Sequence, residues 1–201
     1  PTLYQLKPRF QQSLRRLVEQ AWRWGVTPNQ ITVTALLLSV VTGLLLVWFH
    51  TYPVIFLAAP VVLLLRMALN AMDGMLARRY QMQTPLGAIL NEVGDVVADV
   101  ALYLPFATLD FLPPLLIVLI VVGTFCTEMT GVVAVQIGAT RRYDGPLGKR
   151  DRALLFSLYA LVIQWGQPQP LLLTLCAVGA LLLLVLTIYN RAYHALQEVK
   201  P

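Results

Sequence analysis

The sequence predicts an all-α membrane protein with six transmembrane helices and an N-terminal amphipathic helix at the membrane surface. Its composition is the first observation, because 58% of the 201 residues are hydrophobic and only 12% are charged. A soluble domain is nearer half apolar and a quarter charged. The second observation is six separate apolar segments, and the third is that the basic residues fall into alternate connections between them.

Residues 1–26 are expected to form a juxtamembrane segment that precedes a membrane domain of residues 27–201. In residues 3–24, Leu, Phe, Val and Trp are interspersed with Lys and Arg. This pattern is typical of an amphipathic helix that lies at the interface with its basic groups near anionic headgroups. A poorly ordered basic tail is the alternative. A signal peptide is not expected, because the first apolar segment follows this basic stretch and more spans come after it.

Each expected span is an apolar segment that has, or nearly has, the about 20 residues needed to cross the hydrocarbon core. Cys126 and Cys176 fall inside spans, so we interpret them as small apolar residues and not as part of a disulfide or metal framework. The six spans are residues 30–49, 54–77, 86–108, 112–138, 153–166 and 169–190.

The positions of the basic residues predict the orientation of the chain. All 15 Lys and Arg residues except Arg66 lie before the first span, in the 78–85 and 139–152 loops, or after residue 190. By the positive-inside rule these segments and both termini face the cytoplasm. Topology therefore accounts for the net charge of +5, and nucleic acid is not an expected partner.

Two polar stripes lie on consecutive spans, where charged side chains are costly. A carboxylate near the bilayer centre costs roughly 2.5–3.5 kcal/mol, so it indicates a functional site. The first stripe has the helical spacing i, i+3, i+4, i+7 and the second repeats every four residues, so each occupies one helix face. The stripes consist of Asn70, Asp73, Gly74 and Ala77, and of Gly87, Asn91, Asp95 and Asp99.

The short loop between these spans makes the helices antiparallel neighbours, so the two stripes are expected to face each other. At 1.5 Å per residue, Asp73 lies about 7 Å deeper than the boundary residue Arg78, within the cytoplasmic leaflet. Carboxylate and amide oxygens favour a hard cation such as Mg²⁺ or Mn²⁺. Gly74 and Gly87 have two interpretations, which are close approach of a ligand to the backbone and close packing of helices.

The stripes resemble the signature of the CDP-alcohol phosphotransferase family, D-x2-D-G-x2-A-R-x8-G-x3-D-x3-D. Here the pattern runs from Asn70 to Asp95 at the same spacing, and only Asn70 and Asn91 depart from it, each an Asn for an Asp. The sequence TPNQIT at residues 27–32 is similar to the family's TPNxIT motif before the first span. A shifted register with Asp95 and Asp99 as the last two aspartates would place Asn91 at the glycine position, so the unshifted register is preferred.

The resemblance implies transfer of a phosphatidyl group from a CDP-linked lipid, most simply CDP-diacylglycerol, to a small alcohol, with release of CMP. It implies a bacterial inner membrane, a site facing the cytoplasm, and membrane lipids as surroundings; a homodimer is left open. One or two Mg²⁺ or Mn²⁺ ions are implied, with Asp95 as general base. The implied metal ligands are Asn70, Asp73, Asn91 and Asp95, and the implied nucleotide-binding residues are Asn29, Gly74, Ala77, Arg78 and Gly87.

Other polar residues extend this hypothesis. Lys149 and Arg152 resemble the basic start of the family's fifth span, where they would meet the substrate phosphate or the acceptor. Glu92 and Asp99 are candidates to compensate for the two amides. Glu128 lies inside a span and either faces the same cavity or pairs with Arg66.

Two other functions remain as alternatives. The two asparagines should weaken metal binding, which favours a non-catalytic member that binds lipid or nucleotide. An ion-coupled transporter would also use intramembrane carboxylates, but the repeated halves and broken helices common in transporters are not evident in this sequence.

Overall fold

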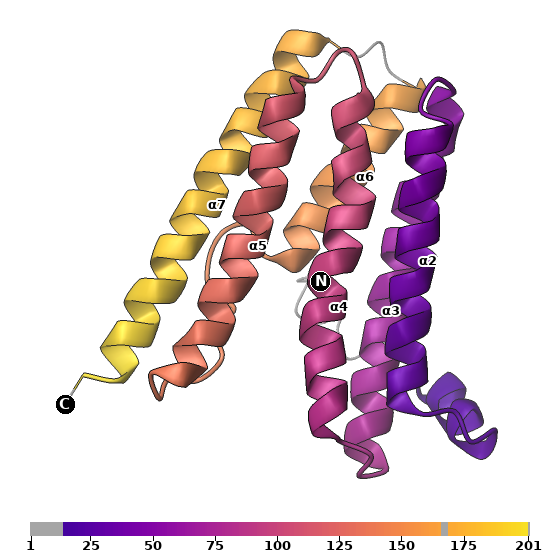
Figure 1. Ribbon diagram of the computed structural model, residues 1–201, viewed down its shortest axis with the longest axis vertical. Coiled ribbons are helices and arrows are strands. Elements are labelled where there is room, and N and C mark those ends of the chain that lie inside the picture. The colour runs from indigo at the N-terminus through magenta and orange to yellow at the C-terminus, as the bar shows by residue number, and fades with distance from the viewer. Residues whose placement is uncertain (1–13, 166–168, 201) are drawn as a thin grey trace, which may run out of the picture. The chain divides into compact units, whose positions relative to one another are not determined.

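The computed structural model describes residues 14–165 and 169–200. Throughout this range the regular elements are helices (Figure 1). Residues 14–23 are helical and precede six long helices, with short 3₁₀ segments at Pro53–Leu57 (η1) and Leu104–Thr108 (η2). The long helices are α2 (Pro28–Trp48), α3 (Ala58–Arg79), α4 (Pro85–Tyr103), α5 (Pro114–Gln136), α6 (Lys149–Trp165) and α7 (Pro170–Glu198).

Four segments of the described chain are long and apolar enough to cross a membrane. They are α2, the segment Pro53–Arg79 formed by η1 and α3, α5, and α7. Helix α4 carries Glu92, Asp95 and Asp99, and α6 has only 17 residues. The protein is therefore a helical membrane protein, whereas the count of six spans stays a prediction. The same holds for the interfacial N-terminal helix, because its first residues lie outside the described range and residues 14–23 are shown only to be helical.

Two helix ends differ from the expected spans for local reasons. The third expected span reaches residue 108, but α4 ends at Tyr103 and continues as η2. Pro105 lacks the backbone N–H that an α-helix needs there. The last span was expected to end at residue 190, whereas α7 continues to Glu198. Its final turns contain the good helix formers Ala, Leu, Gln and Glu, and they place Arg191 on a helix.

The described residues group into two compact units. Unit 1 contains residues 14–41 and 61–98, and unit 2 contains residues 42–60 and 99–200. The boundaries fall inside α2, α3 and α4, so each of these helices contributes to both units. The two units are described separately below.

Unit 1 has a core where the N-terminal helix meets α2 and α3. Val18, Ile31 and Leu76 are buried there. The Trp22 and Tyr80 rings stack with centroids 4.6 Å apart. These contacts hold the helix of residues 14–23 against the end of α3.

The end of α3 is a Schellman motif, in which a left-handed residue closes the helix. Gln81 has φ +54°, and the Met82 N–H donates to the Ala77 carbonyl at 2.9 Å. This motif stops α3 just after Arg79 and allows the chain to reverse into α4. The turn therefore places the two polar stripes on neighbouring helices of unit 1.

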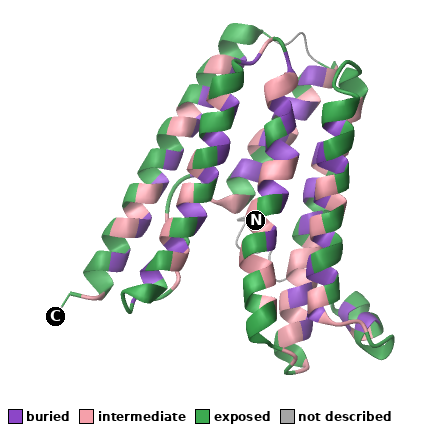
Figure 2. Cartoon of the chain, in the orientation of Figure 1, coloured by how far each residue is buried: buried purple, intermediate pink, exposed green. Residues whose placement is uncertain are grey.

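In unit 2, α5 packs along α7 (Figure 1). A cluster of stacked and edge-to-face rings joins η1, η2 and α6, with Phe106 5.1 Å from both Phe56 and Phe156. Buried residues recur along one side of each helix, while exposed residues cover the other (Figure 2). The exposed side includes large apolar residues such as Leu115 and Leu171, which is the pattern of a lipid-facing surface.

Candidate active site

The two polar stripes meet in unit 1. We call Asn70, Asp73, Asn91 and Asp95 the carboxylate site. Its α3 and α4 members are joined by a hydrogen bond, in which Asn70 Nδ2 donates to Asp95 Oδ1 at 2.7 Å. Asp73 is 6% exposed, and Asn70, Asn91 and Asp95 are half-buried. The contact between Asn70 and Asp95 is what we expect if the two stripes face each other.

Arg66 lies one helical turn before Asn70 on α3 and contacts the same aspartate. Its Nη2 atom is 3.3 Å from Asp95 Oδ1 and donates to the Asp95 carbonyl at 2.8 Å. Arg66 is 3% exposed. An arginine so deeply buried is tolerable only beside a carboxylate and a hydrogen-bond acceptor. The residue that topology could not explain thus has a place at the site.

Asp73 is held by α2. Its Oδ2 atom accepts a hydrogen bond of 2.7 Å from the Thr32 hydroxyl. Thr32 comes from the TPNQIT segment, which the structure shows to be a capping box. The Thr27 N–H donates to Gln30 Oε1 at 2.9 Å, and the Gln30 N–H donates to Thr27 Oγ1 at 3.3 Å. The motif therefore fixes the start of α2 and places a hydroxyl on the site carboxylate.

The two signature glycines differ in what surrounds them. A Cβ on Gly87 would lie 2.6 Å from Asn29 Oδ1, so packing against Asn29 requires the glycine. The three atoms nearest to a Cβ built on Gly74 all belong to the Arg78 guanidinium, at 3.3–3.6 Å, which is the mobile end of a side chain. The nearest contacts at Gly74 are therefore with a side chain of its own helix.

The remaining predicted residues of this stretch lie nearby in sequence but have different surroundings. Ala77 and Glu92 are half-buried, and Arg78 is exposed at the end of α3. Asp99 is 1% exposed and belongs to unit 2, where its Oδ2 atom lies 3.3 Å from Arg152 Nη2.

The donor set of the carboxylate site is made of oxygen ligands, which suits a hard divalent cation. It holds two carboxylates and two amides, and the described residues contain no group of three or more His, Cys, Asp or Glu side chains placed to hold a metal. The donor type suits Mg²⁺ or Mn²⁺, but an ion held here would have to use amide oxygens as well as the two carboxylates.

Unit 2 contains a second buried polar group, which we call the arginine cluster: Arg141, Arg152 and Arg191 around Glu128. Arg152 Nη2 lies 2.8 Å from Glu128 Oε1, and Arg141 and Arg191 lie 3.3 and 3.5 Å from Oε2. With Asp99 the cluster has three positive and two negative side chains.

Arg152 is the centre of the arginine cluster. It is 0% exposed, and its Nη1 atom donates to Thr127 Oγ1 and the Leu147 carbonyl at 3.2 and 3.3 Å. Arg191 donates to the carbonyls of Thr127 and Asp144. Lys149, the other predicted basic residue, is half-buried at the start of α6.

Four further residues belong to these two groups without having been predicted from the sequence: Thr32, Thr127, Arg141 and Arg191. Thr32 lies within the quoted motif, which was an available signal. Arg191 and Arg141 were counted only as cytoplasmic loop or tail residues. The need of Glu128 for a positive partner was visible, but its partners come from three different segments that spacing does not connect.

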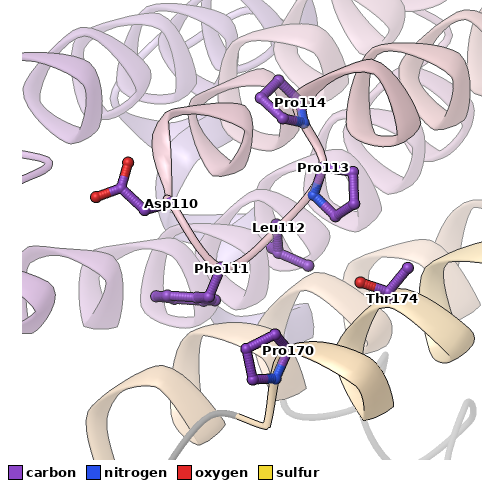
Figure 3. Close-up of a pocket in the computed structure, with 7 residues that line it drawn as sticks. All are labelled: Asp110, Phe111, Leu112, Pro113, Pro114, Pro170 and Thr174. Atoms are coloured by element: carbon purple, nitrogen blue, oxygen red, sulfur yellow. The ribbon is translucent and has the colours of Figure 1, made fainter.

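A pocket in unit 2 lies apart from these groups (Figure 3). It is open and mostly apolar. The Asp110 carboxylate points away from Pro170 and Thr174 in this view (Figure 3). None of the predicted site residues lines it; its walls are Asp110, Phe111, Leu112, Pro113, Pro114, Pro170 and Thr174.

Residues 25–196 match the CDP-alcohol phosphatidyltransferase family. The chain belongs to this family. It is 47% identical over 199 residues to the inner membrane protein YnbA of Escherichia coli K12, covering 97% of this chain and 96% of that protein. An uncharacterized protein of Aquifex aeolicus VF5 is 34% identical over 104 residues, which are 52% of this chain and 49% of that protein.

Solved structures of a phosphatidylinositol phosphate synthase (PgsA1) of Mycobacterium tuberculosis have the same fold. The complex with manganese and citrate matches with a TM-score of 0.74 at 19% identity, covering 92% of this chain and 89% of that chain. The complex with CDP-DAG matches with a TM-score of 0.69 at 21% identity, covering 92% of each chain.

Proposed function

We propose that this protein transfers a phosphatidyl group from CDP-diacylglycerol to a small alcohol, and that the carboxylate site carries the reaction. The observation behind the proposal is the pairing of the two signature helices in a member of the CDP-alcohol phosphatidyltransferase family. Asn70 and Asp95 meet across α3 and α4, and Asp73 is buried one turn further along α3. The PgsA1 structures with manganese and with CDP-DAG support the same metal and donor classes here.

Asp95 is the proposed general base. The acceptor hydroxyl attacks the phosphorus that carries the diacylglycerol while Asp95 takes its proton. A phosphodiester bond forms, the bond between that phosphorus and the bridging oxygen breaks, and CMP leaves with the bridging oxygen. Arg66 and Asn70 both contact Asp95 Oδ1, so they hold the carboxylate in one orientation.

The proposed metal ligands are Asp73 and Asp95, with the amide oxygens of Asn70 and Asn91 as weaker candidates. A bound Mg²⁺ or Mn²⁺ would neutralise charge on the diphosphate and stabilise the negative charge on the departing CMP. Thr32 orients Asp73 for this role through the 2.7 Å hydrogen bond.

The proposed nucleotide-binding face consists of Asn29, Gly74, Ala77, Arg78 and Gly87. Gly74 supports it most directly, because the atoms nearest to a Cβ there belong to the flexible end of Arg78. A phosphate or ribose can approach the α3 backbone at that point if the Arg78 side chain moves aside. Gly87 acts through Asn29, whose position it permits.

Contact with the acceptor is proposed for Lys149. Arg152 already donates to Thr127, Leu147, Asp99 and Glu128, so we assign it a positioning role in the arginine cluster. We further propose that both termini and the 78–85 and 139–152 loops face the cytoplasm.

Mass spectrometry of lipids made by the purified protein tests the function. The protein in liposomes receives CDP-diacylglycerol, Mg²⁺ or Mn²⁺, and a panel of alcohols that includes glycerol phosphate, inositol phosphate and serine. We expect one phosphatidyl product that Asp95→Asn does not make. Absence of any product from this panel would count against the proposed reaction.

A non-catalytic member that binds a CDP-lipid is the second candidate function. The observation that favours it is that Asp95 already has an arginine and an amide donor on one oxygen. Tight binding of CDP-diacylglycerol with no CMP release from any acceptor would establish it.

A further inference from the structure

Arg66 introduces a permanent positive charge into the carboxylate site. It is buried on α3, and its guanidinium reaches both the side chain and the backbone carbonyl of Asp95. Arginine keeps its charge under all ordinary conditions. Any cation that binds to Asp95 therefore meets a like charge beside its ligand.

Asn70 reinforces the effect of Arg66. Of the two polar atoms of an asparagine side chain, only the amide nitrogen can donate to a carboxylate, so the 2.7 Å contact turns the Asn70 NH₂ group toward Asp95 Oδ1. An aspartate at position 70 would place two carboxylates at this distance, an arrangement that requires a cation or a proton between them. Here the N–H group takes the place of that cation.

The formal charges lead to the same conclusion. Asp73 and Asp95 are the two acidic members of the carboxylate site, and Arg66 offsets one of them. Four aspartates, as in the signature that this sequence resembles, can neutralise two divalent ions. A site with two carboxylates and one arginine lacks the charge for a second ion, because buried charges must be compensated locally.

We propose that Arg66 takes the electrostatic place of one metal ion, so that the site binds a single divalent cation on the Asp73 side. The inference rests on the proposed function only in its use of a metal at this site. Arg66 is a positioning residue for Asp95, and the bound ion is coordinated chiefly through Asp73.

Counting bound Mn²⁺ tests the proposal. The purified protein in nanodiscs is titrated with Mn²⁺ in the absence of nucleotide, because free CDP would itself bind Mn²⁺, and free Mn²⁺ is followed by electron paramagnetic resonance. We expect one ion per wild-type chain and one for Arg66→Lys, which keeps the charge. Arg66→Gln combined with Asn70→Asp should bind two ions. Arg66→Gln alone should bind the first ion more tightly, on the order of tenfold, because a like charge is removed from its vicinity.

Arg79→Gln is the matched control, because Arg79 lies at the end of the same helix. Its partner is Glu19, with Nη2 and Oε1 2.8 Å apart, and not a residue of the carboxylate site. It should bind Mn²⁺ like the wild type. Two ions per wild-type chain would overturn the proposal, even if Arg66 variants fail to fold. One ion in the folded double variant, with unchanged affinity in Arg66→Gln, would also overturn it.

The count is independent of catalysis. A wild-type chain that binds one ion, with the expected response to Arg66, supports the inference even if no phosphatidyl product forms. Product formation together with two bound ions would leave the proposed function standing and remove the inference. Binding that survives Asp73→Asn unchanged would contradict the position assigned to the ion.

Discussion

The Thr32 hydroxyl donates a 2.7 Å hydrogen bond to Asp73 Oδ2 within unit 1. Both side chains are buried, with exposures of 9% and 6%. The bond joins the TPNQIT motif at the start of α2 to Asp73, which occupies the second aspartate position of the family signature. Because a charge-assisted hydrogen bond fixes the carboxylate in one orientation, Thr32 prepares Asp73 for its proposed ligand role.

Thr32→Val tests this role with little change of side-chain shape. The variant should bind Mn²⁺ more weakly, on the order of tenfold, since a hydrogen bond to a charged group contributes about 1.5–3 kcal/mol. Thr34→Val is the control, because the Thr34 hydroxyl donates only to its own helix at Gln30 in the described contacts. Mn²⁺ titrations of both variants compare them. Equal affinity in Thr32→Val and wild type would exclude an orienting role.

Gly74→Ala should weaken binding of CDP while leaving the fold intact. The atoms nearest to the new methyl group belong to the flexible end of Arg78, but the methyl group would project toward the proposed nucleotide. Calorimetric titration with CDP and a thermal melt separate the two effects. Gly87→Ala provides the contrast, because its methyl group would lie 2.6 Å from Asn29 Oδ1 and should lower the melting temperature as well. Unchanged CDP affinity in Gly74→Ala would remove Gly74 from the nucleotide-binding face.

Glu128→Ala should strongly destabilise the protein. The change leaves Arg141, Arg152 and Arg191 without their shared carboxylate, and removing one partner of a buried ion pair costs about 3–5 kcal/mol. The control is Glu198→Ala, which breaks a more exposed pair with Arg142 and two exposed hydrogen bonds from Thr140, and should cost clearly less than Glu128→Ala. Denaturation in matched detergent measures both. Similar losses for the two variants would show that the arginine cluster is not a buried electrostatic network.

The orientation predicts which positions an impermeant thiol reagent reaches on intact cells. With Cys126 and Cys176 replaced, cysteines at Thr51 and Gln169 should react, whereas cysteines at Thr84 and Tyr143 should not. All four positions are exposed in the structure, so burial does not explain a lack of reaction. Labelling at position 143 on intact cells would contradict the predicted orientation. It would also contradict the supply of the nucleotide substrate from the cytoplasm.

Much of unit 1 could be predicted from the sequence, because the spacing of Asn70, Asp73, Asn91 and Asp95 is a local property of two consecutive helices. Because the short turn closed by Gln81 makes the two helices neighbours, the contact between Asn70 and Asp95 follows from this spacing. The helix-forming segments were also predictable from their apolar runs. The assignment of spans is less certain, because α4 carries the very carboxylates that lower its hydropathy.

The arginine cluster could not be predicted in the same way. Glu128, Arg152 and Arg191 come from α5, α6 and α7, so their pairing depends on how distant helices pack. The continuation of α7 past residue 190 was also needed to place Arg191. Arg66 could be recognised as an anomaly within a span, but the only partner suggested for it was Glu128. The structure instead places Arg66 beside Asp95 of α4.

Acceptor-dependent release of CMP shows whether the carboxylate site carries phosphatidyl transfer. The wild-type protein in liposomes, given CDP-diacylglycerol and the acceptor found by mass spectrometry, should release one CMP for each phosphatidyl product. Asp95→Asn should reduce the rate by at least about a hundredfold, as removal of a general base does. Asp73→Asn should also reduce the rate strongly, because it removes a proposed metal ligand. Retention of the wild-type rate in a folded Asp95→Asn variant would contradict the claim that the carboxylate site carries phosphatidyl transfer.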